Sequence, residues 1–233
     1  MSDRLSIVIG TLNRADGLRH AVESLLRQST GASEYEILVV DNGSTDSTSD
    51  VCLSLMKLHQ NLRYVREPAL GLSNARNRGI AEARYDLIGF FDDDATAESG
   101  WIESYLRLFR TRTDVDAAGG PIVVKWPNGR PCWLPTTCEG YFGHCFYGIE
   151  QRLLSFPEYP FGSNMVIRRS ALTAVGGFKD SVGPKGQNMM SAGEQDLFAR
   201  LALIGTIACQ RTTRQQTSWR SLDGPLRPRH LPS

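Results

Sequence analysis

Short apolar runs alternate with segments of helical periodicity through the first half of the chain. The apolar runs predict buried strands, and they occupy residues 5–9, 35–40, 61–66 and 87–91. Between and after these runs, apolar residues recur three or four positions apart, which predicts amphipathic helices. These helices are expected near residues 18–26, 44–58, 71–83 and 98–109, with Leu58 on an inner face. This alternation is typical of an α/β fold, with a mostly parallel sheet and helices on both faces.

The pattern changes after residue 115. A single strand is expected over residues 117–124, and residues 126–160 combine Pro, Gly and aromatic side chains without a clear period. We interpret the latter segment as irregular chain that covers a cleft. A strand at 164–167 and two helices at 170–175 and 194–204 follow. In the last helix, the inward-facing residues are expected to be Leu197, Leu201 and Ile204.

The apolar run that ends at Phe91 leads directly into three carboxylates, Asp92, Asp93 and Asp94. Adjacent like charges repel each other, so a cation is expected beside them. Mg²⁺ in proteins is commonly held by one or two carboxylates together with substrate phosphates. A solvated acidic loop is the alternative, but ligands of α/β sheets bind at the carboxyl ends of strands, which favours a site.

Two further polar clusters follow predicted parallel strands, namely Thr11 with Asn13 and Asp41 with Asn42. The carboxyl ends of such strands share one edge of the sheet, so the clusters are expected to meet in one crevice. The chain has neither a G-x-G-x-x-G after the first strand nor a G-x-x-x-x-G-K-[ST] motif, which disfavours a dinucleotide or P-loop ligand. Asp41 can accept a base N–H, and Asp92 and Asp93 can accept ribose hydroxyls.

Arg76 stands near the start of the predicted 71–83 helix. It can direct positive charge toward phosphates, while a surface ion pair is the alternative. Asp94 can hold a metal on a diphosphate.

Composition excludes several functional classes. The 233 residues carry a net charge of +1, which gives no electrostatic support for nucleic-acid binding. No apolar run approaches the roughly 20 residues that span a bilayer, although a peripheral membrane contact stays open. The first residues lead straight into a strand pattern without a signal-peptide layout, so a cytoplasmic location is expected. Five cysteines without CxxC spacing favour reduced thiols.

The chain resembles a family 2 glycosyltransferase with the GT-A fold over roughly residues 4–207. The matching segments are SIVIGTLNR (6–14), ILVVDNGSTD (37–46), GLSNARNRG (71–79), FFDDD (90–94), FGSNMVIRR (161–169) and GGF (176–178). The resemblance implies one domain over residues 1–210, with a donor half to about residue 115 and an acceptor half after it. Residues 211–233 form an atypical basic tail that we expect to be loosely ordered.

The resemblance further implies a nucleotide-sugar donor and an Mg²⁺ or Mn²⁺ cofactor, with Asp94 as the metal ligand. The donor-binding residues would be Thr11, Asn13, Arg14, Asp41, Asn42, Arg76, Asp92 and Asp93. The family places a catalytic carboxylate at the start of a late helix, usually within an acidic pair. Aligning the Asp-Leu-x-x-Arg-Leu run puts Glu194 on the base position and Gly193 where the first acid normally stands.

The expected activity is therefore transfer of a hexosyl-type sugar from a nucleoside-diphosphate sugar to a hydroxyl acceptor, with inversion and metal assistance. The acceptor class stays open among carbohydrate, lipid-linked and small-molecule hydroxyls. The chain departs from the family at Gly193 and in its tail, where His230 is the sole histidine and its setting differs from the usual metal-reaching one. Two alternatives follow, a catalytically impaired nucleotide-sugar-binding protein and a sugar nucleotidyltransferase.

Overall fold

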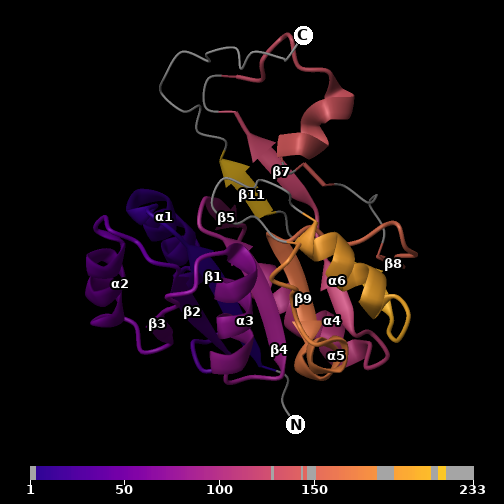
Figure 1. Ribbon diagram of the computed structural model, residues 1–233, viewed down its shortest axis with the longest axis horizontal. Coiled ribbons are helices and arrows are strands. Elements are labelled where there is room, and N and C mark those ends of the chain that lie inside the picture. Colours follow the sequence, from indigo (N-terminus) through magenta and orange to yellow (C-terminus); the bar gives the residue numbers. More distant parts are fainter. Residues whose placement is uncertain are drawn as a thin grey trace.

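The main sheet of the computed structural model contains eight strands in the order β3-β2-β1-β4-β9-β6-β10-β8 (Figure 1). The structure describes residues 4–126, 129–142, 144–145, 151–182, 192–210 and 215–218. The strands of this sheet are β1 (Leu5–Thr11), β2 (Tyr35–Asp41), β3 (Leu62–Arg66), β4 (Leu87–Asp92), β6 (Ala117–Gly119), β8 (Arg152–Leu153), β9 (Asn164–Arg168) and β10 (Ile207–Cys209). Strands β3, β2, β1 and β4 run parallel, whereas β9 is antiparallel to both β4 and β6. The expected mostly parallel α/β architecture is confirmed.

Helices bury both faces of this sheet. They are α1 (Ala15–Leu26), α2 (Thr48–Met56), α3 (Leu72–Glu82), α4 (Trp101–Thr111), α5 (Arg169–Val175) and α6 (Gly193–Leu201). Ile7 and Ile9 of β1 pack in one cluster with α1, α2 and α4, while Val8 packs in the other with α3, α5 and α6. Because successive strand residues face opposite sides, burial on both sides produces the continuous apolar runs seen in the sequence.

The single strand expected over residues 117–124 is wrong, because this segment divides between two sheets. Residues 117–119 form β6 of the main sheet, and β7 (Ile122–Lys125) joins a second sheet of order β5-β11-β7. Pro121 has no N–H to continue a ladder. A Cβ on Gly119 would overlap the Pro160 ring, so the chain passes closely beside another segment at this point. The break therefore coincides with a residue that cannot extend the ladder.

The second sheet brings distant segments together above the main sheet (Figure 1). It contains β5 (Ala95–Ala97), immediately after the three carboxylates, and β11 (Gln215–Ser218) between β5 and β7. Strand β11 is antiparallel to β5 and parallel to β7. Residues 215–218, expected to be loosely ordered, are thus paired in a sheet. The rest of the basic tail, including His230, lies outside the described residues.

Two residues expected on inner helix faces are instead exposed. Leu58 is 76% exposed and Ile204 is 58% exposed. Their helices end at Met56 and Leu201, so the periodicity that would direct them inward stops before them. Within the part of the chain that the structure describes, no helix is long and apolar enough to cross a membrane. In the described part of residues 126–160, which were expected to be irregular, the structure contains a short 3₁₀ helix, η1 (Thr136–Phe142), and chain without regular structure, but Arg152–Leu153 form β8 of the main sheet.

Candidate active site

The three polar clusters meet at one edge of the main sheet. In the parallel ladder, Thr11 is opposite Asp41 and Gly10 is opposite Asp92, so β1, β2 and β4 end at the same level. The Thr11 hydroxyl donates to Asp93 Oδ2 at 2.7 Å. The backbone N–H of Asn42 donates to the Thr11 carbonyl at 2.9 Å. The convergence predicted from strand ends is therefore present in the structure.

Asp41 is 1% exposed and is bonded within the wall of the crevice. Its Oδ1 accepts the Ser44 N–H at 2.7 Å, and its Oδ2 accepts the Tyr64 hydroxyl at 2.5 Å. Burial alone would raise the pKa of Asp41, but these hydrogen bonds and the nearby Arg66 outweigh it and lower the pKa. The carboxylate is therefore ionised at neutral pH, and its contact with a nucleotide base stays a prediction.

Asn13 shapes the loop after β1. Its backbone adopts φ 54°, a left-handed conformation that Asn tolerates better than most residues. Its side-chain Oδ1 accepts the Thr45 N–H at 2.8 Å, and its own N–H donates to Ser44 Oγ at 2.9 Å. These bonds join the loops after β1 and β2, so Asn13 builds the crevice between them.

The three aspartates differ in their surroundings. Arg14 Nη1 lies 2.8 Å from Asp94 Oδ2 and 3.9 Å from Asp93 Oδ1. Burial raises the pKa of Asp93 to about 6, against the Thr11 hydrogen bond and Arg14. Burial also raises the pKa of Asp92, opposed by Arg76, although 43% of the Asp92 side chain is open to solvent and hydration offsets part of the rise. Arg14 and Arg76 thus offset only part of the effect of burial on the pKa values of Asp93 and Asp92.

This donor set fits a divalent cation only in company with another ligand. Among the described residues, no group of three or more His, Cys, Asp or Glu side chains is arranged to hold a metal ion. Asp94 has a partly exposed carboxylate that a cation can reach, and Asp93 stands beside it. One or two carboxylates suffice for Mg²⁺ when substrate phosphates supply further oxygens. The residues present therefore fit a metal held jointly with a diphosphate.

Arg76 and Glu194 form a buried ion pair between α3 and α6. Arg76 Nη1 donates to Glu194 Oε1 at 2.7 Å, and Arg76 Nη2 lies 4.0 Å from Asp92 Oδ1. Arg76 comes from α3 and Glu194 from the first turn of α6, so the pair joins the two halves of the chain. The surface ion pair weighed from the sequence is wrong, because only 5% of Arg76 is exposed. Its contact with donor phosphates stays a prediction.

Asp196 belongs to a different cluster from Glu194. Its carboxylate accepts Lys179 Nζ at 2.9 Å and Arg200 Nε at 3.0 Å. Asp196 and Glu194 thus have different cationic partners, as the two-residue offset along a helix predicts. Gly193, where the family usually has an acid, is the first residue of α6 and is buried.

Sequence reasoning missed three residues of this site. Phe178 packs its ring 5.1 Å from the Arg76 guanidinium, Tyr64 donates to Asp41, and Gly162 lies against the Arg76–Glu194 pair. Gly162 and Phe178 stand in segments already recognised as family motifs, so a signal was available. Tyr64 gave none, because an aromatic residue in a strand is ordinary.

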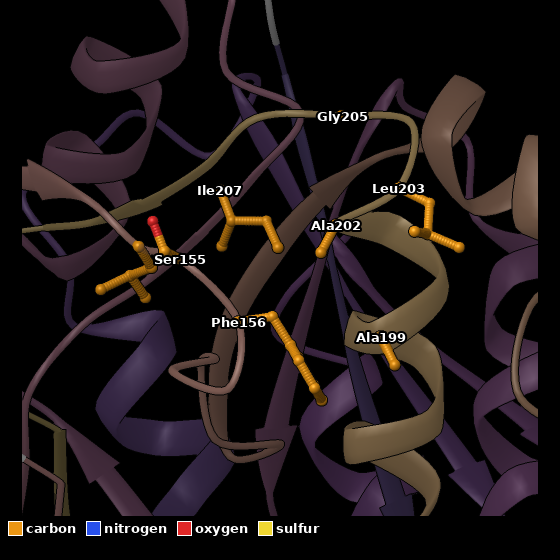
Figure 2. A pocket seen from close by; sticks show the side chains of 8 residues that line it. Ser155, Phe156, Ala199, Ala202, Leu203, Gly205 and Ile207 are labelled. Carbon is orange, nitrogen blue, oxygen red and sulfur yellow. The ribbon is translucent and has the colours of Figure 1, made fainter.

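A separate hollow of about 350 Å³ lies near the carboxyl end of α6 (Figure 2). Figure 2 shows Phe156 directed toward Ala199 of α6, with Ile207 of β10 and Leu203 at the margins. Its lining contains no ionisable side chain. The hollow therefore lacks the carboxylates and arginines that are present at the ends of β1, β2 and β4.

Together, the strand order, the carboxylates at the end of β4 and the late acidic helix start define a glycosyltransferase-like crevice. Residues 6–176 match the family model described as Glycosyl transferase family 2. The chain belongs to this family.

Relatives extend this assignment to most of the chain. The glucosyl-dolichyl phosphate glucuronosyltransferase of Haloferax volcanii is 27% identical over 206 residues, covering 85% of this chain and 63% of the relative. The chondroitin synthase of Escherichia coli is 34% identical over 119 residues, covering 50% of this chain and 17% of the relative. The chain thus spans less than two thirds of the length of these relatives.

Solved structures agree on the fold. A crystal structure of S. aureus TarS 1-349 superposes with a TM-score of 0.71 at 18% identity, covering 92% of this chain and 60% of that one. TarS 1-349 in complex with UDP-GlcNAc superposes with a TM-score of 0.70. This likeness shows the GT-A fold.

Proposed function

We propose that this chain is an inverting glycosyltransferase of hexosyltransferase type that moves a sugar from a nucleoside diphosphate to a hydroxyl acceptor with metal assistance. The observation that carries the proposal is the buried bridge between the two halves. Arg76 contacts Glu194 of the acceptor half at 2.7 Å and approaches Asp92 of the donor half to 4.0 Å. A candidate base and the donor-side carboxylates thus lie on opposite sides of one guanidinium.

The donor half supplies groups suited to a nucleotide. Asp92 and Asp93 offer acceptors for ribose hydroxyls, and Thr11 orients Asp93 through its 2.7 Å hydrogen bond. Asp94 and Asp93 would hold Mg²⁺ or Mn²⁺ with the diphosphate, and the metal supplies positive charge that balances the departing diphosphate. Arg14 already neutralises Asp94 from the β1 side and can turn to phosphate oxygens.

Glu194 would accept the proton of the attacking hydroxyl. Its pKa is lowered, because the ion pair with Arg76 outweighs the effect of burial, so the carboxylate is ionised and able to take a proton. Attack by the acceptor hydroxyl on the face opposite the leaving diphosphate passes through an oxocarbenium-like state in one step. Such a displacement inverts the anomeric centre.

The relatives suggest which substrates to test first. A structural neighbour was crystallised with UDP-GlcNAc, so UDP-sugars are the first donors. The Haloferax volcanii relative is named for a glucosyl-dolichyl phosphate, so lipid-linked sugars belong in the acceptor panel beside carbohydrates and small hydroxyl compounds. Incubation with Mg²⁺ or Mn²⁺, followed by NMR of the product, gives both the activity and the anomeric configuration.

Glu194→Gln tests the base, and Asp196→Asn on the same helix is the matched control. We expect Glu194→Gln to lower kcat by about 10²-fold, the usual scale of general-base catalysis, with UDP affinity by calorimetry nearly unchanged. Asp196→Asn should stay within a few-fold of the wild type, because its partners are Lys179 and Arg200. Asp94→Ala should remove the stimulation by metal.

Three results would contradict the proposal. Loss of activity in Asp196→Asn but not in Glu194→Gln would move the base. Donor binding without turnover across the whole panel would favour the catalytically impaired binding protein. That alternative arises because Gly193 stands where the family usually has an acid. Release of pyrophosphate from a sugar 1-phosphate and a nucleoside triphosphate would favour the nucleotidyltransferase.

A further inference from the structure

The buried guanidinium of Arg76 contacts the candidate base, Glu194. The Arg76 guanidinium packs 5.1 Å from the Phe178 ring and 6.0 Å from the Phe90 ring, and it bonds to Glu194 Oε1 at 2.7 Å. Such cation–π packing fixes the plane of the guanidinium as well as its charge. Phe90 and Phe178, whose ring centroids are 5.2 Å apart, and the Glu194 carboxylate together hold Arg76 in the orientation that makes the ion pair.

The geometry points to Arg76 as the positioning residue of Glu194, an inference that rests on the proposed function. Arg76 anchors Oε1 and leaves Oε2 as the oxygen that takes the acceptor proton. The hydrogen bond and the ion pair from Arg76 Nη1 both go to Oε1, at 2.7 Å. In this arrangement, Arg76 holds Oε1 in place, and the acceptor hydroxyl approaches Oε2.

Gly162 provides the space for this pair. A Cβ built on Gly162 would overlap Glu194 Oε1 and would lie 2.5 Å from Arg76 Nη2. Both contacts fall at the ends of the two side chains, where the hydrogen bond between them is made. Any larger residue at this position must therefore displace Arg76, Glu194 or both, without altering the charge of the site.

Arg76 keeps the Glu194 carboxylate ionised against the effects of its other surroundings. Burial disfavours the ionised carboxylate, and Asp92 from β4 adds a nearby negative group, while Tyr159 packs as an uncharged phenol beside α6. Arg76 outweighs these effects and keeps the pKa of Glu194 below its ordinary value. Without Arg76, the carboxylate is expected to take up a proton at a higher pH, so the ionised form that can act as a base is lost at a higher pH than in the wild type.

The test compares Arg76→Ala and Gly162→Ala with the wild type, and Gly31→Ala is the matched control because its added Cβ meets only Ser33 Oγ, at an ordinary contact distance of 4.0 Å. We expect Arg76→Ala and Gly162→Ala to lower kcat by about 10²-fold, the scale of a displaced catalytic group, with little change in donor KM. The acid limb of the pH profile of kcat should move to higher pH in Arg76→Ala. Added guanidinium should restore part of kcat in Arg76→Ala, and urea, which has the same shape without charge, should not.

A measurement without turnover separates this inference from the proposed function. The carboxyl ¹³C signal of Glu194, assigned by its loss in Glu194→Gln, is titrated in the wild type and in Arg76→Ala. A higher midpoint in Arg76→Ala supports the anchor even if no acceptor is found. An unmoved midpoint overturns it, and so does normal kcat with weakened UDP binding in Arg76→Ala, which would place Arg76 on the donor phosphates.

Discussion

Asn42→Asp tests whether the crevice wall depends on the direction of its hydrogen bonds. Asn42 is buried directly after β2. Its Nδ2 donates to the carbonyls of Glu67 and Ala69 at 3.0 and 2.7 Å, and its Oδ1 accepts the Gly71 N–H at 2.7 Å. The substitution keeps the shape and the bond to Gly71, but it places a carboxylate oxygen against two carbonyl oxygens. The loop that leads into α3 would lose both of its accepting contacts.

The expected loss of stability follows from the two hydrogen bonds that Asn42 donates. At about 1 kcal/mol for each net hydrogen bond, two lost bonds cost about 2 kcal/mol, and a buried acceptor facing other acceptors adds about 1 kcal/mol or more. We therefore expect Asn42→Asp to lower the free energy of unfolding by about 3 kcal/mol at neutral pH. This is a large share of the roughly 5–15 kcal/mol typical of a folded domain.

The loss of stability in Asn42→Asp should become larger as the pH rises. The protonated form of the introduced carboxyl can donate to one of the two carbonyls, so folding raises its pKa above the unfolded value of about 3.9. The stabilising contribution of the protonated form is complete below that unfolded value, and it is lost as pH rises through the folded pKa. The free energy of unfolding of Asn42→Asp should therefore approach that of the wild type in acid and drop below it toward neutral pH.

Urea unfolding at several pH values between about 4 and 8 measures this difference. Asn42→Ala, which loses all three bonds without adding a titrating group, should be destabilised by a similar amount with no such extra slope. Asn74→Asp is the matched control, because Asn74 is only half-buried and, among the described residues, its side chain donates a single hydrogen bond, to the Leu70 carbonyl at 3.1 Å. A variant Asn42→Asp as stable as the wild type at neutral pH would refute the reasoning.

Two further substitutions test the packing behind the site. Gly79→Ala places a Cβ against the Val8 side chain, and the cost of overpacking, about 1–3 kcal/mol, should exceed the gain of about 1 kcal/mol in helix propensity. A lowered urea midpoint supports this, whereas a raised midpoint would show that α3 adjusts freely. Trp101→Phe removes the indole N–H that donates to Asn164 Oδ1 at 2.9 Å and leaves a gap in the core. We expect it to cost about 2 kcal/mol in urea unfolding, and an unchanged midpoint would contradict that packing.

The part of the fold that could be predicted from the sequence is the part governed by local burial. Strands β1, β2 and β4 are buried on both faces, so their sequences are mostly apolar, apart from the buried Ser6 and Glu36 and the polar residues at their carboxyl ends, and they stand out from the helices. The division between β6 and β7 falls at Pro121, beside the close approach of Gly119 to Pro160, and these two residues are far apart in sequence. Such a contact leaves no periodic signal in either segment.

The same distinction applies to the candidate site. The meeting of Thr11, Asp41 and Asp92 could be predicted because it follows from parallel strands that end at one edge. The ion-pair partners of the charged residues could not be predicted, because the sequence offers several carboxylates with which each arginine could pair. Arg76 pairs with Glu194, 118 positions away, and Arg14 pairs with Asp94, 80 positions away. Only packing decides among such choices.

The second sheet explains how the atypical tail bears on the carboxylates. Asp92 is the last residue of β4, and β5 begins at Ala95, so the acidic segment spans the junction between the two sheets. Strand β11 holds β5 by placing Thr217 opposite Ala95 and Gln216 opposite Thr96. Asp94 is thus one residue from a position that the tail pairs directly. A change in β11 should therefore reach the proposed metal ligand through the backbone, whether or not a tail side chain takes part in the chemistry.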